Sequence, residues 1–189
     1  MGQWLREQVS SHAASGEAGL APTDNAAVTK QLWAPWRLSY VQQAGEEDGC
    51  VFCREVAGEL GDDSLVVHRG ETGLVLLNKF PYSSGHLMVA PLRHVASLEE
   101  LTESEVVEVH RLTSAAVAAL RSAYSPDAFN VGWNLGEVAG GSITGHLHEH
   151  VVPRWAGDTN FMPVLADIKV VPEHLLATRE RLTAAWGAA

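Results

Sequence analysis

The sequence predicts an α+β domain built on an antiparallel sheet, with one long central helix and a second helix near the C-terminus. Two short apolar runs, at 74–78 and 86–91, are separated by turn-forming residues, which is typical of neighbouring antiparallel strands. A capped amphipathic helix is expected at about 102–120, and two further strand-like runs follow at 128–135 and 146–153. With 189 residues, 46% of them hydrophobic, the chain is long enough to bury a sizeable core.

The N-terminal segment and the overall charge set the context for this domain. Residues 1–28 are rich in Ala, Ser, Gly and Glu with little patterned apolar content, so we expect a flexible extension before a domain at 29–189. The sequence has no run of 18 apolar residues and no signal-like start, which predicts a cytoplasmic protein. The net charge of −10 argues against non-specific binding to nucleic acids or membranes. Any anion site must therefore be local.

A hairpin and a long helix form the centre of the predicted fold. The strands Leu74–Asn78 and His86–Pro91 lie on either side of the turn-rich Phe80–Gly85. The helix is expected to begin after Thr102, because Glu105 lies three residues later and completes a capping box. Its apolar face has helical spacing and comprises Val106, Val109, Leu112, Ala116, Val117 and Leu120.

The second half of the chain supplies two more strands and the last helix. Ala128–Leu135 and His146–Pro153 have the composition of strands. The last helix is expected from about Pro172 to Trp186, with Gly187 beyond its end. The resulting order of elements fits an antiparallel sheet covered by helices.

Three histidines at alternate positions, His146, His148 and His150, are the most informative feature for function. A strand repeats every two residues, so the three imidazoles are expected on one face of the sheet. Nucleophilic catalysis by one of them, oriented by its neighbours, is the favoured interpretation. A zinc ion bound by all three is less favoured, because same-face Cβ atoms lie about 6 to 7 Å apart. Simple packing of the rings is the third interpretation.

Cys50-Val-Phe-Cys53 contains both cysteines of the chain. Their two-residue spacing suits a zinc site, which then needs two further ligands. A redox disulfide is disfavoured because the sequence around the pair lacks a thioredoxin-like βαβ pattern. Two buried free thiols are the remaining alternative.

Gly140-Gly141-Ser142, just before the strand that carries the three alternating histidines, is a candidate phosphate-binding loop. Glycines let backbone N–H groups approach an anion closely, and the Ser142 hydroxyl is able to donate to a phosphate oxygen. An ordinary flexible turn is the alternative.

The motif His146-Leu-His-Glu-His-Val-Val resembles the His-φ-His-φ-His-φ-φ signature of the histidine triad (HIT) family of nucleotide hydrolases and transferases, in which φ is apolar. The resemblance extends from about Gln31 to Trp186. The segments Leu77–Pro81, Asn134–Gly136 and Pro153–Asp158 resemble the branch that cleaves diadenosine polyphosphates, including actinobacterial members that act on diadenosine tetraphosphate, some of which are phosphorylases. The resemblance implies a HIT-like fold.

The resemblance also implies roles for three histidines. His148 would attack the α-phosphorus to form a nucleotidyl-histidine, which water or phosphate then resolves. His150 would contact the phosphate and help to protonate the leaving oxygen. The alternative is that the role of His150 is orientation only. His86 would form a hydrogen bond into the triad and fix the tautomer of the nucleophile.

Other family positions imply contacts with the nucleotide. Asn134 matches an amide that contacts the α-phosphate, and Asn78 matches a position that faces the ribose. Ser142 would join the catalytic groups. Trp155 is a candidate for stacking on a second base, although core packing is the commoner role of tryptophan.

The zinc-bearing members of the family provide the missing ligands. His94 and His146 match their ligand positions and, with Cys50 and Cys53, would form a structural Cys₂His₂ site. One residue departs from the signature, because Glu149 stands where an apolar residue is expected. A buried carboxylate at this position needs a partner or water.

The resemblance further implies a homodimer that acts on adenine nucleotides. Mg²⁺ is expected to accompany the polyanionic substrate of so acidic a protein. Two other classes of function stay open: a nucleotide-binding regulatory module and an adenosine phosphoramidate hydrolase. A sugar-phosphate uridylyltransferase is disfavoured, because those enzymes are much longer and carry Gln where this chain has His150.

Overall fold

The computed structural model describes residues 49–140, 143, 145–158 and 173–187. The predictions for 1–28, Gly141, Ser142 and Pro172 concern residues outside these ranges. In chain order the described elements are α2 (Val51–Ala57), η1 (Gly61–Asp63), β1 (Val66–Arg69), β2 (Gly73–Leu77), β3 (Leu87–Pro91), η2 (Leu98–Glu100), α3 (Glu103–Tyr124), β4 (Ala128–Trp133), η3 (Glu137–Ala139), β5 (Glu149–Arg154) and α5 (Leu175–Ala185). The predicted α+β class with a long central helix and a C-terminal helix is confirmed.

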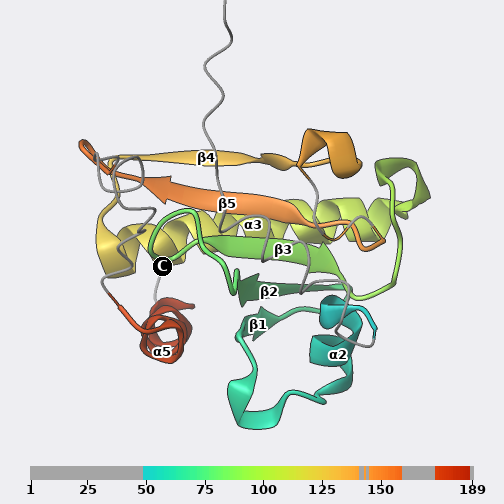
Figure 1. Ribbon diagram of the computed structural model, residues 1–189, viewed down its shortest axis with the longest axis horizontal. Coiled ribbons are helices and arrows are strands. Elements are labelled where there is room, and N and C mark those ends of the chain that lie inside the picture. Colours follow the sequence, from blue (N-terminus) through green and yellow to red (C-terminus); the bar gives the residue numbers. More distant parts are fainter. Residues whose placement is uncertain (1–48, 141–142, 144, 159–172, 188–189) are drawn as a thin grey trace, which may run out of the picture. The chain divides into compact units, whose positions relative to one another are not determined.

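The strands form one antiparallel sheet in the order β1-β2-β3-β5-β4 (Figure 1). β2 and β3 pair from Gly73 opposite Pro91 to Leu77 opposite Leu87, which confirms the predicted hairpin. β5 lies between β3 and β4, and its side chains alternate between the two faces of the sheet.

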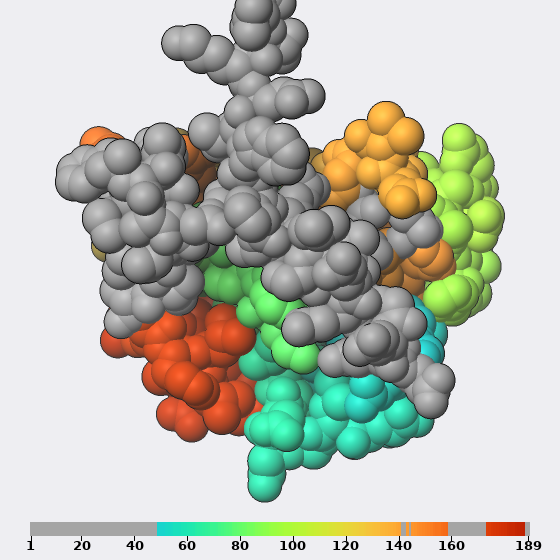
Figure 2. All heavy atoms as spheres, viewed as in Figure 1, coloured from blue at the N-terminus to red at the C-terminus, as the bar shows by residue number. Residues whose placement is uncertain are grey.

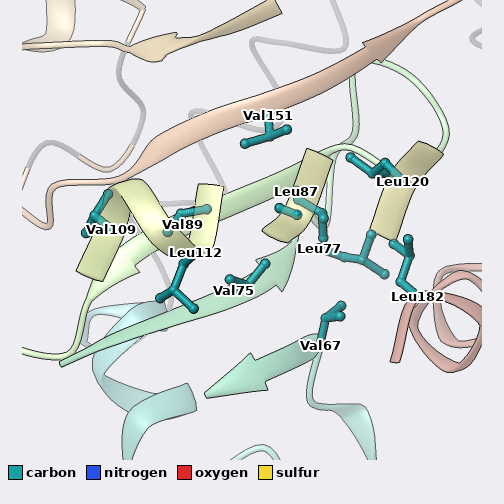
Figure 3. Close-up of a cluster of buried hydrophobic side chains, with 11 residues drawn as sticks. Val67, Val75, Leu77, Leu87, Val89, Val109, Leu112, Leu120, Val151 and Leu182 are labelled. Carbon is teal, nitrogen blue, oxygen red and sulfur yellow. The ribbon is translucent and has the colours of Figure 1, made fainter. Parts of the chain in front are cut away.

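Alternation along β2 and β3 divides the apolar core between the two faces of the sheet. Odd-numbered residues such as Val75 and Val89 pack beneath α3 and α5, together with Leu120 and Leu182 (Figure 3). Even-numbered residues such as Leu74 and Met88 pack with Phe52 of α2 on the other face. Because both faces are covered, β2 and β3 are buried at every position and their sequences are continuous apolar runs.

The start of α3 follows the predicted capping box. The Thr102 side chain accepts from the backbone N–H of Glu105, whose carboxylate accepts from the backbone N–H of Thr102. Arg93 donates to the same carboxylate at 2.8 and 3.0 Å and ties the β3 end to the helix. Of the predicted apolar face, Val109, Leu112, Ala116 and Leu120 are buried and Val117 is partly buried. Val106 is 51% exposed, because it lies at the margin of that face.

The last helix packs beside β1, as the space-filling view also shows (Figure 2). Arg179 donates to the carbonyl of Ser64 at 2.5 Å, and the Trp186 ring stacks on His68 with centroids 4.7 Å apart. The described part of the helix begins after His174, whose ring accepts from the N–H of Leu176. It thus starts later than predicted.

Strand β5 also begins later than the predicted His146, at Glu149. Its pairing with β3 stops at Val89 opposite Glu149. Further along β3, Pro91 has no N–H to donate, and the N–H of Leu147 bonds instead to the carbonyl of Val95 at 2.7 Å. His146 and His148 therefore lie in an irregular segment that leads into the strand. Among the described helices, none is long and apolar enough to cross a membrane.

Candidate active site and metal centre

Four side chains from distant parts of the sequence form a cluster at α2. The Sγ of Cys50 lies 3.3 Å from Nδ1 of His146, and the Sγ of Cys53 lies 3.3 Å from Nδ1 of His94. All four ligand atoms lie within 4.8 Å of one another. Ligand atoms on one tetrahedral zinc ion are separated by about 3.3 to 3.8 Å, given Zn–S and Zn–N bonds of about 2.3 and 2.0 Å. The predicted ligands are therefore brought together at distances that suit Zn²⁺.

The protonation of His146 also fits a metal ligand. Its Nε2–H donates to the carbonyl of Pro91 at 2.9 Å, so the lone pair of the neutral ring is on Nδ1, the atom that faces both sulfurs. The ring is fully buried and packs on Phe52 with centroids 4.9 Å apart. A buried, pre-oriented imidazole is what a structural zinc site requires.

The same geometry argues against a redox thiol pair. Both cysteines are free thiols. Burial and the neighbouring Cys50 raise the pKa of Cys53, whereas reactive thiols in Cys-X-X-Cys motifs have lowered pKa values. A positive metal ion is the partner that would stabilise these sulfurs as thiolates.

His148 is buried next to this cluster, with its tautomer fixed by the backbone. Its Nδ1–H donates to the carbonyl of His146 at 2.8 Å. Nε2 therefore carries the lone pair of the neutral ring. Burial lowers the pKa of His148, and the hydrogen bond to His146 partly opposes this shift. A neutral imidazole with one unprotonated nitrogen is a competent nucleophile.

His150 and His86 form a second, separate hydrogen-bonded pair. The N–H of Tyr82 donates to Nδ1 of His86 at 3.1 Å, so the neutral His86 ring carries its hydrogen on Nε2. That Nε2–H lies 3.0 Å from Nδ1 of His150 and donates to it. Consequently His150 carries its own hydrogen on Nε2. Gly85, with a φ of 76°, makes the left-handed turn that directs the chain from Ser83 into buried His86.

The side-chain amide of Asn134 lies at the open end of this relay. Nε2 of His150 lies 3.2 Å from the amide nitrogen of Asn134, which follows β4. The His148 and His150 rings lie edge to face with centroids 5.0 Å apart. An imidazole N–H and a carboxamide near an unprotonated imidazole suit a site for an anionic oxygen next to an electrophilic centre.

Burial, with a smaller contribution from the charge of His148, lowers the pKa of His150 from 6.5 to about 4. Between these two pH values the unfolded chain binds more protons than the folded one, so stability is lost as pH falls from about 6.5 to about 4. We expect native protein to lose on the order of 2 kcal/mol more unfolding free energy over this range than His150→Gln, which does not titrate. Urea unfolding at pH 7, 5 and 4 measures this difference. Equal losses in the two proteins would contradict it.

The comparisons with known proteins agree with this arrangement. The family model described as HIT domain matches residues 60–157, a range that includes His86, His94 and the three alternating histidines. The chain belongs to the histidine triad family. Its triad is His146, His148 and His150, and the predicted family membership is confirmed.

Relatives of this histidine triad protein include a curated enzyme and solved structures. AP-4-A phosphorylase from Mycobacterium tuberculosis is 40% identical over 164 residues, which cover 83% of this chain and 84% of that one. A Zn-bound histidine triad family protein from Mycobacterium smegmatis is 26% identical with a TM-score of 0.60, covering 74% of this chain and 94% of that one. The fold also matches a histidine triad nucleotide-binding protein from Sulfolobus tokodaii, which is 24% identical with a TM-score of 0.61, over 74% of this chain and 93% of that one.

The other predicted site residues within the described ranges lie in turns and loops next to the strands and helices. Asn78 accepts from the N–H of Phe80 at 2.9 Å and shapes the turn after β2. Gly140 ends η3 with a φ of 93°. The N–H of Trp155 lies 3.3 Å from the carboxylate of Asp158 in the loop after β5. Gly141 and Ser142 lie outside the described residues.

One expected role is corrected. His86 does form a hydrogen bond into the triad, but its partner is His150. The tautomer of His148 is fixed by the carbonyl of His146 instead. A strand-like spacing does not reveal this, because the irregular backbone before β5 brings that carbonyl to the ring.

Sequence reasoning missed three contacting residues. Phe52 packs on both His146 and His148, and its only signal was its position between the two cysteines. Tyr82, in the turn before β3, packs its ring at a tilt against His86 and stacks on His150. No sequence pattern indicated Thr113 of α3, because its hydrogen-bond partner Glu149 is 36 residues away.

Glu149, which departs from the apolar signature of the triad family, has that partner on α3. The hydroxyl of buried Thr113 donates to the Glu149 carboxylate at 2.5 Å. This hydrogen bond supplies the partner that an inward-facing carboxylate needs.

Thr113→Val is expected to reduce the unfolding free energy by about 1 to 3 kcal/mol, because it leaves the carboxylate without its donor. Glu149→Leu should also be destabilising, since it leaves the Thr113 hydroxyl without its acceptor. The double variant is expected to recover at least about 1 kcal/mol relative to the sum of the two single changes. Denaturant unfolding of the four proteins gives this coupling energy, and simple additivity would contradict it.

Proposed function

We propose that this histidine triad protein cleaves diadenosine polyphosphates, diadenosine tetraphosphate foremost, through a nucleotidyl-histidine formed on His148. The observation that carries the proposal is the fixed tautomer of His148, which leaves Nε2 unprotonated in a ring whose centroid lies 5.0 Å from that of His150, itself in contact with Asn134. The 40% identity to an enzyme named AP-4-A phosphorylase supports the choice of substrate.

In the first step Nε2 of His148 attacks the α-phosphorus. The new P–N bond replaces the P–O bond to the leaving nucleotide, which takes the electron pair of the broken bond. The attached ring becomes an imidazolium, and the carbonyl of His146 stabilises it by accepting a charge-assisted hydrogen bond from Nδ1–H. His150 Nε2–H and the Asn134 amide donate to the phosphate oxygens.

In the second step an oxygen of inorganic phosphate or water attacks the same phosphorus. The P–N bond breaks, and His148 leaves as a neutral ring with its electron pair restored. Phosphate as acceptor yields ADP and ATP from diadenosine tetraphosphate, whereas water yields AMP and ATP. Of the remaining predicted residues, Asn78 and Trp155 are proposed to contact the nucleotide, and Gly140, Gly141 and Ser142 its phosphates.

The metal site has a structural role in this proposal. Zn²⁺ held by Cys50, Cys53, His94 and His146 would supply a closed cross-link between α2 and the segment that carries the nucleophile. Mg²⁺ is proposed to accompany the polyphosphate, because the chain carries a net charge of −10.

A homodimer is also proposed. Strand β4 is an edge of the described sheet, and its surroundings carry three exposed apolar side chains, Val131, Leu135 and Val138. An unpaired edge with apolar residues favours association with a second copy.

Chromatographic product analysis tests the function. The protein is incubated with diadenosine tetraphosphate, with and without inorganic phosphate. ADP and ATP that form only with phosphate support a phosphorylase, and AMP and ATP without phosphate support a hydrolase. Binding of the dinucleotide without turnover would overturn the proposed reaction and favour a regulatory module. Turnover of adenosine phosphoramidate alone would indicate the alternative hydrolase.

A further inference from the structure

A second recognition surface extends from the triad along β4 and β5. A cavity of about 450 Å³ has His150 and Asn134 at one end and Arg154 and Asp158 at the other. Asn130 lines it between these ends. The register places Asn130 opposite Val152 and Gly132 opposite His150, so the cavity follows the face of the sheet that carries the triad. From His150 to Arg154 the strand rises about 13 Å.

Arg154 is held at the far end of this cavity by three of the five N–H groups of its guanidinium. Nε and one Nη donate to the two oxygens of Asp158 at 2.5 and 2.9 Å. The other Nη donates to Asn130 at 2.8 Å. The side chain is nevertheless 42% exposed, against 14% for Asp158. With most of its N–H groups engaged, the planar group has its faces left for contact with a ligand.

The charge of this group also limits what it binds. Asp158 neutralises Arg154 at contact distance, and Arg154 in turn holds the pKa of Asp158 at about 2, so the pair stays ionised at neutral pH. An arginine that captures phosphate uses its N–H edges and its positive charge. Here three of the five N–H groups and the charge are already engaged within the protein. A flat, delocalised guanidinium face instead suits stacking on a heterocyclic base.

We propose that this cavity binds the leaving half of the dinucleotide and that its base stacks on the guanidinium face of Arg154. The inference rests on the proposed function, in which the α-phosphorus lies at His148 and His150. The polyphosphate and second ribose then span the strand length between His150 and Arg154. Tyr82, whose side chain is 52% exposed and stacks on His150, forms the wall near the phosphates. Stacking accepts any base, so this half of the substrate is selected by shape rather than by base identity.

The test compares a ligand with two nucleosides and a ligand with one. Arg154→Met and Arg154→Lys are each placed in a chain that carries His148→Ala, so that the ligands are not consumed, and binding is measured by calorimetry. Diadenosine tetraphosphate is expected to bind about 10-fold more weakly to either variant, a change of about 1.4 kcal/mol. The affinity for AMP should change less than about 2-fold. Arg154→Lys is expected to lose this affinity although it keeps the positive charge, because lysine lacks the planar guanidinium group. Arg111→Met, an exposed arginine of α3 outside the cavity, is the matched control.

Unchanged binding of diadenosine tetraphosphate, an equal loss for both ligands, or full recovery by Arg154→Lys would overturn the inference. Failure of the proposed function has a different signature. In that case the native chain does not turn over the dinucleotide, whereas the selective loss of binding in the Arg154 variants persists.

Discussion

Replacing His148 by alanine is expected to lower kcat/KM for diadenosine tetraphosphate by roughly 10³-fold or more. The substitution removes the unprotonated nitrogen of the ring that lies edge to face with His150, with centroids 5.0 Å apart. His146 directs its free nitrogen at the two sulfurs, and both nitrogens of His86 are engaged. No other described histidine of the triad is placed to substitute for it.

Steady-state kinetics on purified proteins measures this loss. His110→Ala is the matched control, because His110 is exposed on α3, and it should retain native turnover. Mass spectrometry of native protein, quenched at neutral pH during turnover, should detect a chain with one added adenylyl group that His148→Ala lacks. A His148→Ala protein that keeps more than about a tenth of native turnover would refute the nucleophile assignment.

Loss of the metal site is expected to have the largest effect on stability. Cys53→Ser, or removal of zinc by a strong chelator, should lower Tm by roughly 10 °C or more, because the ligands join α2 to His94 and to the segment before β5. The chain has only two cysteines, so no other thiol is available to replace Cys53. Without a metal, the two partly buried sulfurs have only weak hydrogen bonds, to the buried ring of His146 and to the exposed ring of His94.

Elemental analysis with thermal unfolding measures this effect. Native protein is expected to carry one zinc per chain and Cys53→Ser less than about a tenth of that. A reducing agent without chelating groups should leave the Tm of native protein unchanged, which distinguishes a metal from a disulfide. Native protein that contains no metal and has the same Tm as Cys53→Ser would contradict the site.

The parts of the fold that sequence patterns predicted are those with local causes. The start of α3 follows from Thr102 and Glu105, which bond to each other across one turn. β2 and β3 shift by no more than one residue from their predicted bounds, because turn residues end both apolar runs. The short α2 and the edge strand β1 were not predicted. α2 has seven residues, and its burial depends on packing of Phe52 against histidines about a hundred positions later in the chain.

The candidate site likewise contains features that the sequence predicted and features that it did not. The alternating histidines and the paired cysteines indicated which side chains matter, and the family pattern added His94 and Asn134. The hydrogen-bond partners that fix the tautomer of each histidine ring could not be predicted from the sequence. The carbonyl of Pro91, the carbonyl of His146 and the N–H of Tyr82 are backbone groups, whose directions depend on the fold and not on residue type.

His146 has two contacts whose consequences become clear only together. Its ring faces the cysteines, while its carbonyl holds the Nδ1–H of His148. We therefore expect a chain that holds Zn²⁺ at this site to keep the His148 ring in its hydrogen-bonded position, and a chain without metal to lose that position. A partly loaded sample would accordingly behave as a mixture of fully active and inactive molecules. Its specific activity would scale with metal content, while the KM of the active fraction would stay constant.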